Sequence, residues 1–306
     1  MSLTAYAYFL EHEGRLEEAL EMVMLAARSQ GTDTTPADFA AYALFAGRLN
    51  RVLARWDAAS ACYSSAEEAA LKVGDPVTAL RGRLGRGAVH RGQGNYPAAR
   101  AAAESVLQEA TALGLPDAQA MAYADLGVIY GLQGLTLEAL EAHYQAFLRG
   151  TDTVKRMRVL GDLALGLLQI GAYDAARLAF QIVANSEAKL LVRVNAFLEL
   201  MDLESSAGNR MAFERCRGAA EEYRDRMSPS MSCDYHYKLG VGLARFGKTK
   251  RARDTLTAGL SLAEEHRLNA WYFKLEQAIG DRTAARDRDR PVLAAARLER
   301  VGIGRP

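Results

Sequence analysis

Cysteine and proline are scarce in this chain, with three and seven residues among 306. Cys62, Cys216 and Cys233 form an odd, widely spaced set, and none makes a metal-binding spacing with another Cys or a His. A free Cys in a helix behaves as a small hydrophobic residue. We therefore expect buried, inert thiols that form neither a disulfide framework nor a metal site.

An excess of charge of one sign is also absent. The 38 Lys and Arg residues nearly balance 37 Asp and Glu residues, giving a formal net charge of +1. This balance argues against a dedicated nucleic-acid or membrane binder. No run approaches the ~20 apolar residues that a membrane-spanning helix needs, and residues 1–15 lack the pattern of a signal peptide. We expect a soluble, cytoplasmic protein without a membrane partner.

Alternating β-branched segments are missing, and this absence favours helices over a sheet. Half of the residues are apolar, with Ala and Leu the most common. In residues 117–147, apolar and small residues recur at helical spacing on both sides of Gly134, and Tyr123, Leu126 and Tyr130 share one face before it. This segment predicts two amphipathic helices folded against each other, and the whole chain is predicted to be all-α.

The turn at Gly134 recurs along the chain at intervals of 37 to 40 residues. The turn positions are Gly14, Ala54, Gly94, Gly134, Gly171, Gly208 and Gly247. Small residues recur five positions after and seven positions before most turns, where the two helices of a pair must cross. These are Ala19, Ala59, Ala99, Ala139, Ala176 and Ala252, and Ala7, Gly47, Gly87, Gly127, Ala164 and Gly240. The sixth repeat has Met201 and Phe213 instead, so we expect a wider or displaced helix pair there.

The combination of Leu126, Gly127, Tyr130, Gly134, Ala139 and Ala146 resembles a tetratricopeptide repeat (TPR). The repeat length of about 40 residues and joints such as Val-Gly-Asp-Pro at 73–76 resemble the sensor arms of bacterial STAND-type signalling proteins and regulators. The resemblance implies a right-handed superhelical solenoid of about seven helical hairpins with a C-terminal capping helix. A HEAT-like stack is the alternative. The small residues at both crossing positions favour the TPR interpretation.

Two regions are expected along the chain. The repeats and the capping helix should occupy residues 1–280. Residues 281–306 are rich in Arg and Asp, and we expect a mobile tail in which residues 292–301 could form one or two helical turns.

The TPR resemblance implies that the first helix of each hairpin lines a concave, partner-binding groove. Reading the exposed positions of those helices gives Arg48, Arg51, Arg81, Leu84, Arg91, Met121, Val128, Arg158, Leu165, Asn195, Asp202, Asp234 and Tyr237, together with Leu44, Gly131, Leu168, Leu198 and Val241. We expect an acidic segment of a partner to meet Arg48, Arg81 and Arg91, and apolar side chains to lie on Leu84, Met121, Val128 and Leu165. The alternative is that the arginines pair with neighbouring carboxylates such as Asp125.

Residues 242–249 read Gly-Leu-Ala-Arg-Phe-Gly-Lys-Thr and match the phosphate-loop motif of nucleotide-binding enzymes. Such a loop leaves a buried strand, whereas Leu239, Leu243 and Phe246 keep helical spacing into this segment. We interpret the match as coincidental. Since no nucleophile with a base is evident either, we expect a non-enzymatic protein without a cofactor.

Three functional classes remain after these exclusions. The TPR resemblance implies a protein- or peptide-binding module in a scaffold, an adaptor or a signalling sensor. A structural adaptor that self-assembles through its ends is the alternative, because Tyr6, Tyr8 and Phe9 either pack inward or form a homodimer contact. Nucleic-acid binding through the basic residues of 248–253 is less favoured, since aromatic residues do not interleave with them.

Overall fold

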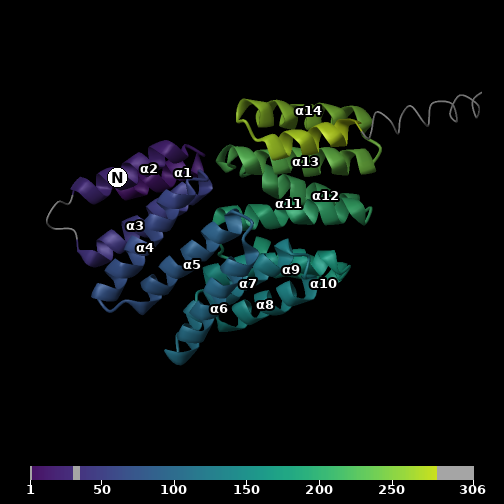
Figure 1. Cartoon of the computed structure of the whole chain (residues 1–306). Coiled ribbons are helices and arrows are strands. Elements are labelled where there is room, and N and C mark those ends of the chain that lie inside the picture. Colours follow the sequence, from purple (N-terminus) through teal and green to yellow (C-terminus); the bar gives the residue numbers. More distant parts are fainter. Residues whose placement is uncertain (1, 30–34, 281–306) are drawn as a thin grey trace, which may run out of the picture. The chain divides into compact units, whose positions relative to one another are not determined.

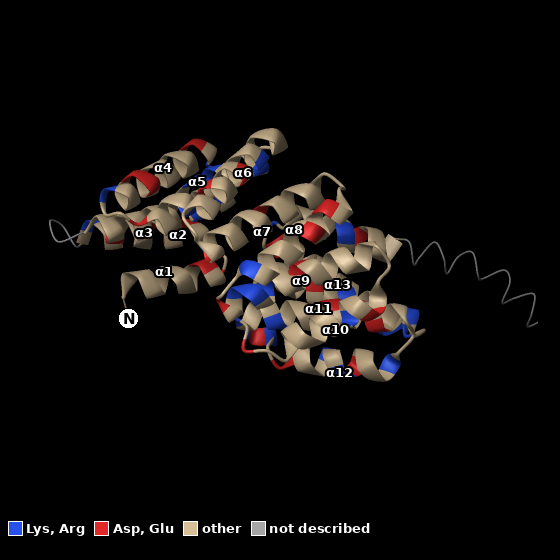
Figure 2. Ribbon diagram, turned by 90° about the horizontal axis from the view of Figure 1, so that it is seen from below, with Lys and Arg blue, Asp and Glu red and all other residues tan. Residues whose placement is uncertain are grey.

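The structure is a computed structural model that describes residues 2–29 and 35–280. All regular elements among these residues are helices (Figure 1). The chain divides into two compact units, Met1–Ala196 and Phe197–Pro306, and the division falls within one helix, α11 (Leu190–Ser206). Basic and acidic residues are distributed over the helices of both units (Figure 2). The expected tail at 281–306 lies outside the described residues.

Unit 1 contains consecutive antiparallel hairpins, in which odd-numbered helices are followed by even-numbered ones. The helices are α1 (Leu3–His12), α2 (Leu16–Ser29), α3 (Pro36–Val52), α4 (Trp56–Lys72), α5 (Pro76–Gly92), α6 (Tyr96–Ala112), α7 (Pro116–Leu132), α8 (Thr136–Arg149), α9 (Thr153–Gln169) and α10 (Tyr173–Ala184). The core lies between successive helices; Leu80, Val106 and Leu126, for example, pack together from α5, α6 and α7. The predicted all-α hairpin fold is confirmed.

Unit 2 continues the same pattern. It contains the rest of α11, then α12 (Arg210–Glu221), the short 3₁₀ helix η2 (Arg224–Arg226), α13 (Pro229–Arg245) and α14 (Thr249–Glu265). Residues 269–280 are also helical, as predicted for a capping helix. Leu275 from this last segment is buried in one cluster with Cys233 of α13 and Leu256 of α14. The segment therefore covers apolar surface that the last hairpin would otherwise expose.

All seven predicted turn positions have the left-handed backbone conformation, with φ between 55° and 77°. The residue that follows each of them donates its backbone N–H to a carbonyl five positions earlier, as in Arg15 to Leu10 (2.9 Å) and Lys248 to Leu243 (2.8 Å). This bond closes the end of a helix in the Schellman arrangement. Glycine adopts such a φ without steric cost, which explains its presence at six of the seven turns.

The small residues predicted at the helix crossings of the other six repeats are all buried. A Cβ at Gly127 would lie 2.5 Å from the ring of His143 on the partner helix, so a larger residue cannot be placed there without a shift. In the sixth repeat, Met201 and Phe213 are fully buried instead. The Phe213 ring occupies the space beside Gly242 of α13, where a Cβ would overlap it. The large residue is thus accommodated by a glycine in the next repeat.

The segment that resembles a phosphate loop, residues 242–249, joins two helices of one hairpin. Gly242 lies inside α13, the helix ends at Arg245, Gly247 forms the turn, and α14 begins at Thr249. The prediction that helical spacing continues into residues 242–249 is therefore confirmed, since no strand precedes this segment among the described residues. Among the helices of the described ranges, none has the length and apolar character needed to cross a membrane.

Candidate functional site

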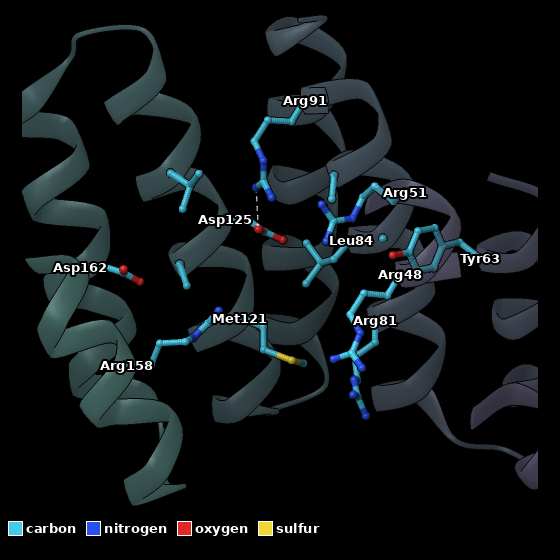
Figure 3. A pocket seen from close by; sticks show the side chains of 14 residues that line it. Arg48, Arg51, Tyr63, Arg81, Leu84, Arg91, Met121, Asp125, Arg158 and Asp162 are labelled. Carbon is cyan, nitrogen blue, oxygen red and sulfur yellow. Dashed lines mark hydrogen bonds and ion pairs between the residues drawn. The ribbon is translucent and has the colours of Figure 1, made fainter. Parts of the chain in front are cut away.

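The first helices of unit 1 form a cavity of about 360 Å³ (Figure 3). Its lining comes from α3, α4, α5, α7 and α9. The lining residues are Arg48, Arg51, Tyr63, Arg81, Leu84, Gly85, Ala88, Arg91, Met121, Ala124, Asp125, Val128, Arg158 and Asp162. Its size is within the range of small-ligand sites.

Helical periodicity places these side chains on a shared surface. On α5, Arg81, Leu84, Ala88 and Arg91 follow one another at intervals of three or four residues, so they lie along one face. The lining residues of α3, α7 and α9 have the same intervals, except that Ala124 and Asp125 of α7 are adjacent. Because α3, α5 and α7 are neighbours in space, their faces together make one continuous wall.

Two of the five arginines are already paired with carboxylates. Arg91 of α5 donates to Asp125 of α7 at 2.8 Å, across the cavity wall. Arg48 donates to Glu11 of α1 at 2.7 Å, and its guanidinium lies 4.8 Å from the centre of the Phe45 ring. These two guanidinium groups are therefore held by the protein itself.

The other three arginines have a different environment. Within residues 2–29 and 35–280, no ion pair is found for Arg51, Arg81 or Arg158. The buried Nε atoms of Arg51 and of Arg48 lack a hydrogen-bond partner among the described residues. Five arginines against two aspartates leave an excess of three formal positive charges (5 − 2) around the cavity.

Tyr63 reaches the cavity from α4, a second helix, by passing between two first helices. A Cβ at Gly47 of α3 would lie 2.9 Å from its ring, and a Cβ at Gly85 of α5 would overlap the ring. Desolvation raises the pKa of the buried Tyr63 hydroxyl, while the nearby Arg51 guanidinium opposes this shift. The two glycines therefore make room for an aromatic ring whose polar end faces the arginines (Figure 3).

Asp162 of α9 faces the cavity on the side away from Arg51 and Arg81 (Figure 3). Burial raises the pKa of its carboxyl group above the usual value, and the nearby Arg158 lowers it in part. The pKa rises because the loss of hydration destabilises the charged carboxylate by more than the charge of Arg158 stabilises it.

The cavity brings together eight of the thirteen predicted groove residues. These are Arg48, Arg51, Arg81, Leu84, Arg91, Met121, Val128 and Arg158. Leu84 was predicted to be exposed, but only 7% of its surface is accessible because it packs into the core between α5 and its neighbours. Of the three arginines predicted to meet an acidic partner, Arg91 pairs with Asp125 and Arg48 pairs with Glu11, as the alternative described.

The remaining predicted residues lie elsewhere. Leu165 on α9 and Asn195 on α11 are exposed and do not line the cavity. In unit 2, Asp202 accepts a hydrogen bond from Arg245 at 2.6 Å and Asp234 accepts one from Lys238 at 2.8 Å. The Tyr237 ring lies 4.3 Å from the Lys274 ammonium. Leu198 and Val241 are buried, so predicting them as exposed was wrong, because their helices are covered by neighbours on that face.

Sequence analysis missed Tyr63, Gly85, Ala88, Ala124 and Asp162 as lining residues, and considered Asp125 only as a pairing partner. Asp162 follows Arg158 by four residues, so the helical period could have identified it. Tyr63 could not be found from the first helices alone. The only sequence signal was the presence of Gly47 and Gly85 on the two helices that flank it.

No protein-family model and no curated protein sequence matches the chain. Solved structures match its fold, among them the following three. A Rap protein complexed with Competence and Sporulation Factor is 12% identical with a TM-score of 0.60, over 91% of this chain and 73% of that chain. The apo form of the quorum sensor NprR from B. thuringiensis is 12% identical with a TM-score of 0.58, over 89% and 79%. A tetratricopeptide repeat protein from Parabacteroides merdae ATCC 43184 is 16% identical with a TM-score of 0.50, over 90% and 97%.

These likenesses concern the fold, since all identities are low. The chain has the fold of a TPR-like helical repeat protein, as its small-residue pattern predicted. The finer resemblance to STAND sensor arms stays a prediction, as does the right-handed course of a complete solenoid.

Proposed function

We propose that this protein is a non-enzymatic protein- or peptide-binding module and that the cavity of unit 1 receives an acidic segment of its partner. The observation that carries this proposal is the lining itself. Arginines surround an apolar surface formed by Leu84, Met121 and Val128, and three of the five have no carboxylate partner among the described residues.

The energetics fit a reversible interaction. A hydrogen bond to a charged group contributes ~1.5–3 kcal/mol, and solvent and salt reduce this value where the group is exposed. Two such bonds together with burial of apolar side chains would give a Kd of about one micromolar. Binding should therefore weaken as salt concentration rises.

The solved structures support a binding function. The Rap protein was solved with Competence and Sporulation Factor bound, and NprR is described as a quorum sensor. Both have the same fold as this chain over most of its length. Their low identity means that the partner of this chain must be identified from its own cavity.

Selection from a displayed library of random dodecapeptides tests the proposal. We expect the wild-type protein to enrich peptides containing Asp and Glu, with affinities that fall in the Arg81→Glu/Arg158→Glu variant by at least tenfold. The matched control is Arg251→Glu/Arg253→Glu on α14, which makes the same charge change at exposed positions of unit 2. Enriched peptides that bind the cavity variant as tightly as the wild type would place the site elsewhere.

Self-assembly through the N-terminal end is a second candidate, favoured by the first helix. Tyr8 and Phe9 on α1 are 51% and 49% exposed. Tyr8 nevertheless stacks on Phe45 of α3, with ring centroids 4.2 Å apart, so it packs partly against the second repeat. Exposed aromatic residues are common at contacts between proteins. Light scattering should then show a homodimer that dissociates in Phe9→Glu, whereas a monomeric wild-type protein would exclude this function.

A further inference from the structure

Among the described residues, Asp162 is the carboxylate of the cavity lining that no basic side chain holds. The other lining carboxylate, Asp125, accepts a hydrogen bond from Arg91 at 2.8 Å. The Asp162 carboxylate has neither an ion pair nor a hydrogen bond within residues 2–29 and 35–280. The cavity therefore presents a free hydrogen-bond acceptor in addition to its unpaired arginines.

Asp162 and two of the unpaired arginines lie on different sides of the cavity. Arg51 belongs to α3 and Arg81 to α5, whereas Asp162 belongs to α9. Figure 3 shows the Asp162 carboxylate pointing into the cavity from the side opposite these arginines. Between them lies α7, which contributes Met121 and Val128 to the lining (Figure 3). A ligand that spans the cavity therefore meets cations on one side, an apolar surface in the middle and an anion on the other side.

The environment of Asp162 favours a cationic ligand group. The side chain is half-buried, and its carboxylate has lost hydration without gaining a hydrogen-bond donor. An ammonium or guanidinium group that donates to such a carboxylate recovers the free energy of the lost hydration. Arg158, one turn earlier on α9, does not take this role, because its side chain extends toward Met121 (Figure 3).

We propose that Asp162 binds a cationic group of the ligand, so that the cavity recognises a bipolar segment with an acidic group at one end and an ammonium or guanidinium group at the other. This inference rests on the proposed function and deepens it, since it adds a second charge to the acidic segment and gives the segment a direction. The acidic end lies at α3 and α5, the apolar part at α7 and the cationic end at α9.

The helix between the two charged sides sets a minimum separation for the charges of the ligand. A packed helix occupies a width of about 8–10 Å, and an extended chain advances about 3.3 Å per residue. We therefore expect at least about three residues between the acidic and the cationic group. The cation comes either from a Lys or Arg side chain or from the amino terminus of the ligand chain.

Three sets of synthetic, amidated peptides test the inference on the full-length protein by calorimetry. Each peptide carries Glu at one end and three to six Ala and Leu residues in the middle. The neutral-ended set is acetylated and has Gln at the other end. The side-chain set is acetylated and has Lys in place of this Gln, and the terminus set keeps the Gln but has a free amino terminus.

We expect one of the two cationic sets to bind the wild-type protein at least fivefold more tightly than the neutral-ended set, and that set identifies the source of the cation. In Asp162→Asn the ratio of the two Kd values should fall to within twofold of one. A cavity that attracts anions alone gives the opposite order, because the neutral-ended peptides have the larger net negative charge.

The matched control is Asp57→Asn, which removes an exposed carboxylate of α4 outside the cavity lining and should keep the wild-type ratio. Asn has the shape of Asp and no charge to desolvate, so Asp162→Asn should unfold in urea at or above the wild-type midpoint. Equal binding of all three sets by the wild-type protein, or a preference for the cation that persists in Asp162→Asn, would overturn the inference.

The two levels of inference fail separately. If a cationic set shows its preference through Asp162 but the library yields no peptide whose binding depends on Arg81 and Arg158, the proposed function is wrong and the cation site stands. If library peptides bind through these two arginines but no cationic set shows a preference through Asp162, the proposed function stands and the cation site is wrong.

Discussion

Arg91 and Asp125 are joined by a hydrogen bond of 2.8 Å that connects α5 to α7 inside the cavity. The aspartate holds a guanidinium that would otherwise be available to a ligand. A ligand carboxylate must compete with Asp125 for Arg91, or bind the arginines that have no such partner. The pair therefore limits how strongly the cavity attracts anions.

Releasing Arg91 should strengthen the binding of acidic ligands. Asp125→Asn removes one negative charge from the lining while keeping the shape of the side chain, so we expect the Kd of a selected acidic peptide to fall by about threefold to tenfold, or about 1 kcal/mol. Calorimetry measures this change at low and high salt. Asp174→Asn on α10, where the side chain is exposed, is the matched control. Weaker binding in Asp125→Asn would mean that the pair orients the site and does not compete with the ligand.

Acid should destabilise unit 1 through His143. This residue is 6% exposed, and desolvation, followed by the charge of Arg158, lowers its pKa to about 4. The unfolded chain binds a proton near pH 6.5 and the folded chain does not until about pH 4, so stability is lost as pH falls between these values, by up to about 3 kcal/mol.

Replacing the titrating ring tests this assignment. His143→Phe keeps a ring beside Gly127 and should reduce the loss of stability between pH 7 and pH 4.5, measured by urea unfolding. The exposed His266→Phe serves as the control. Equal acid sensitivity in wild type and His143→Phe would show that carboxylates alone cause it.

Gly85 should tolerate no side chain. In Gly85→Ala the new methyl group overlaps the Tyr63 ring, and the ring or the helices must move, at a cost of about 1–3 kcal/mol in unfolding free energy. Gly131→Ala on α7 is the control, because nothing lies within 4 Å of a Cβ there. That variant should gain about 1 kcal/mol from helix propensity. Comparable stability of the two variants would contradict the packing of Tyr63 between α3 and α5.

Unit 2 should depend on a buried lysine. Lys238 of α13 donates to Glu199 at 2.7 Å and to Asp234 at 2.8 Å. Lys238→Met leaves two half-buried carboxylates without their cation, and we expect a loss of about 3–5 kcal/mol in thermal or urea unfolding. Adding Glu199→Gln should recover part of this loss. A Lys238→Met variant within 1 kcal/mol of wild type would show that solvent reaches both acids.

The repeat could be predicted because the signals that define it are local. A left-handed turn residue needs glycine or a tolerated substitute such as Ala54, and each Schellman bond is closed within six residues. The rule of small residues five positions after and seven positions before each turn is equally local, since small side chains such as Ala59 and Gly87 are required wherever two helices cross. Phe213 shows the limit of this reasoning, because the space it fills is supplied by Gly242 about thirty residues later.

The site was predicted less completely than the fold. Helical spacing placed Arg81 and Arg158 on one surface, but it could not say which arginines are neutralised. Pairing depends on how far apart neighbouring helices lie and on side-chain conformation, as in the contact of Arg48 with Glu11 on α1. Tyr63 escaped prediction because it belongs to a helix that the groove pattern assigns to the outer layer.

The side-by-side arrangement of α3, α5 and α7 also constrains what can lie across them. Packed helices are about 8–10 Å apart, and an extended chain advances about 3.3 Å per residue. An extended ligand crossing these helices needs about three residues to pass from one to the next. Its sequence would then show a three-residue period whose length is determined by the thickness of a helix and not by any single side chain of the protein.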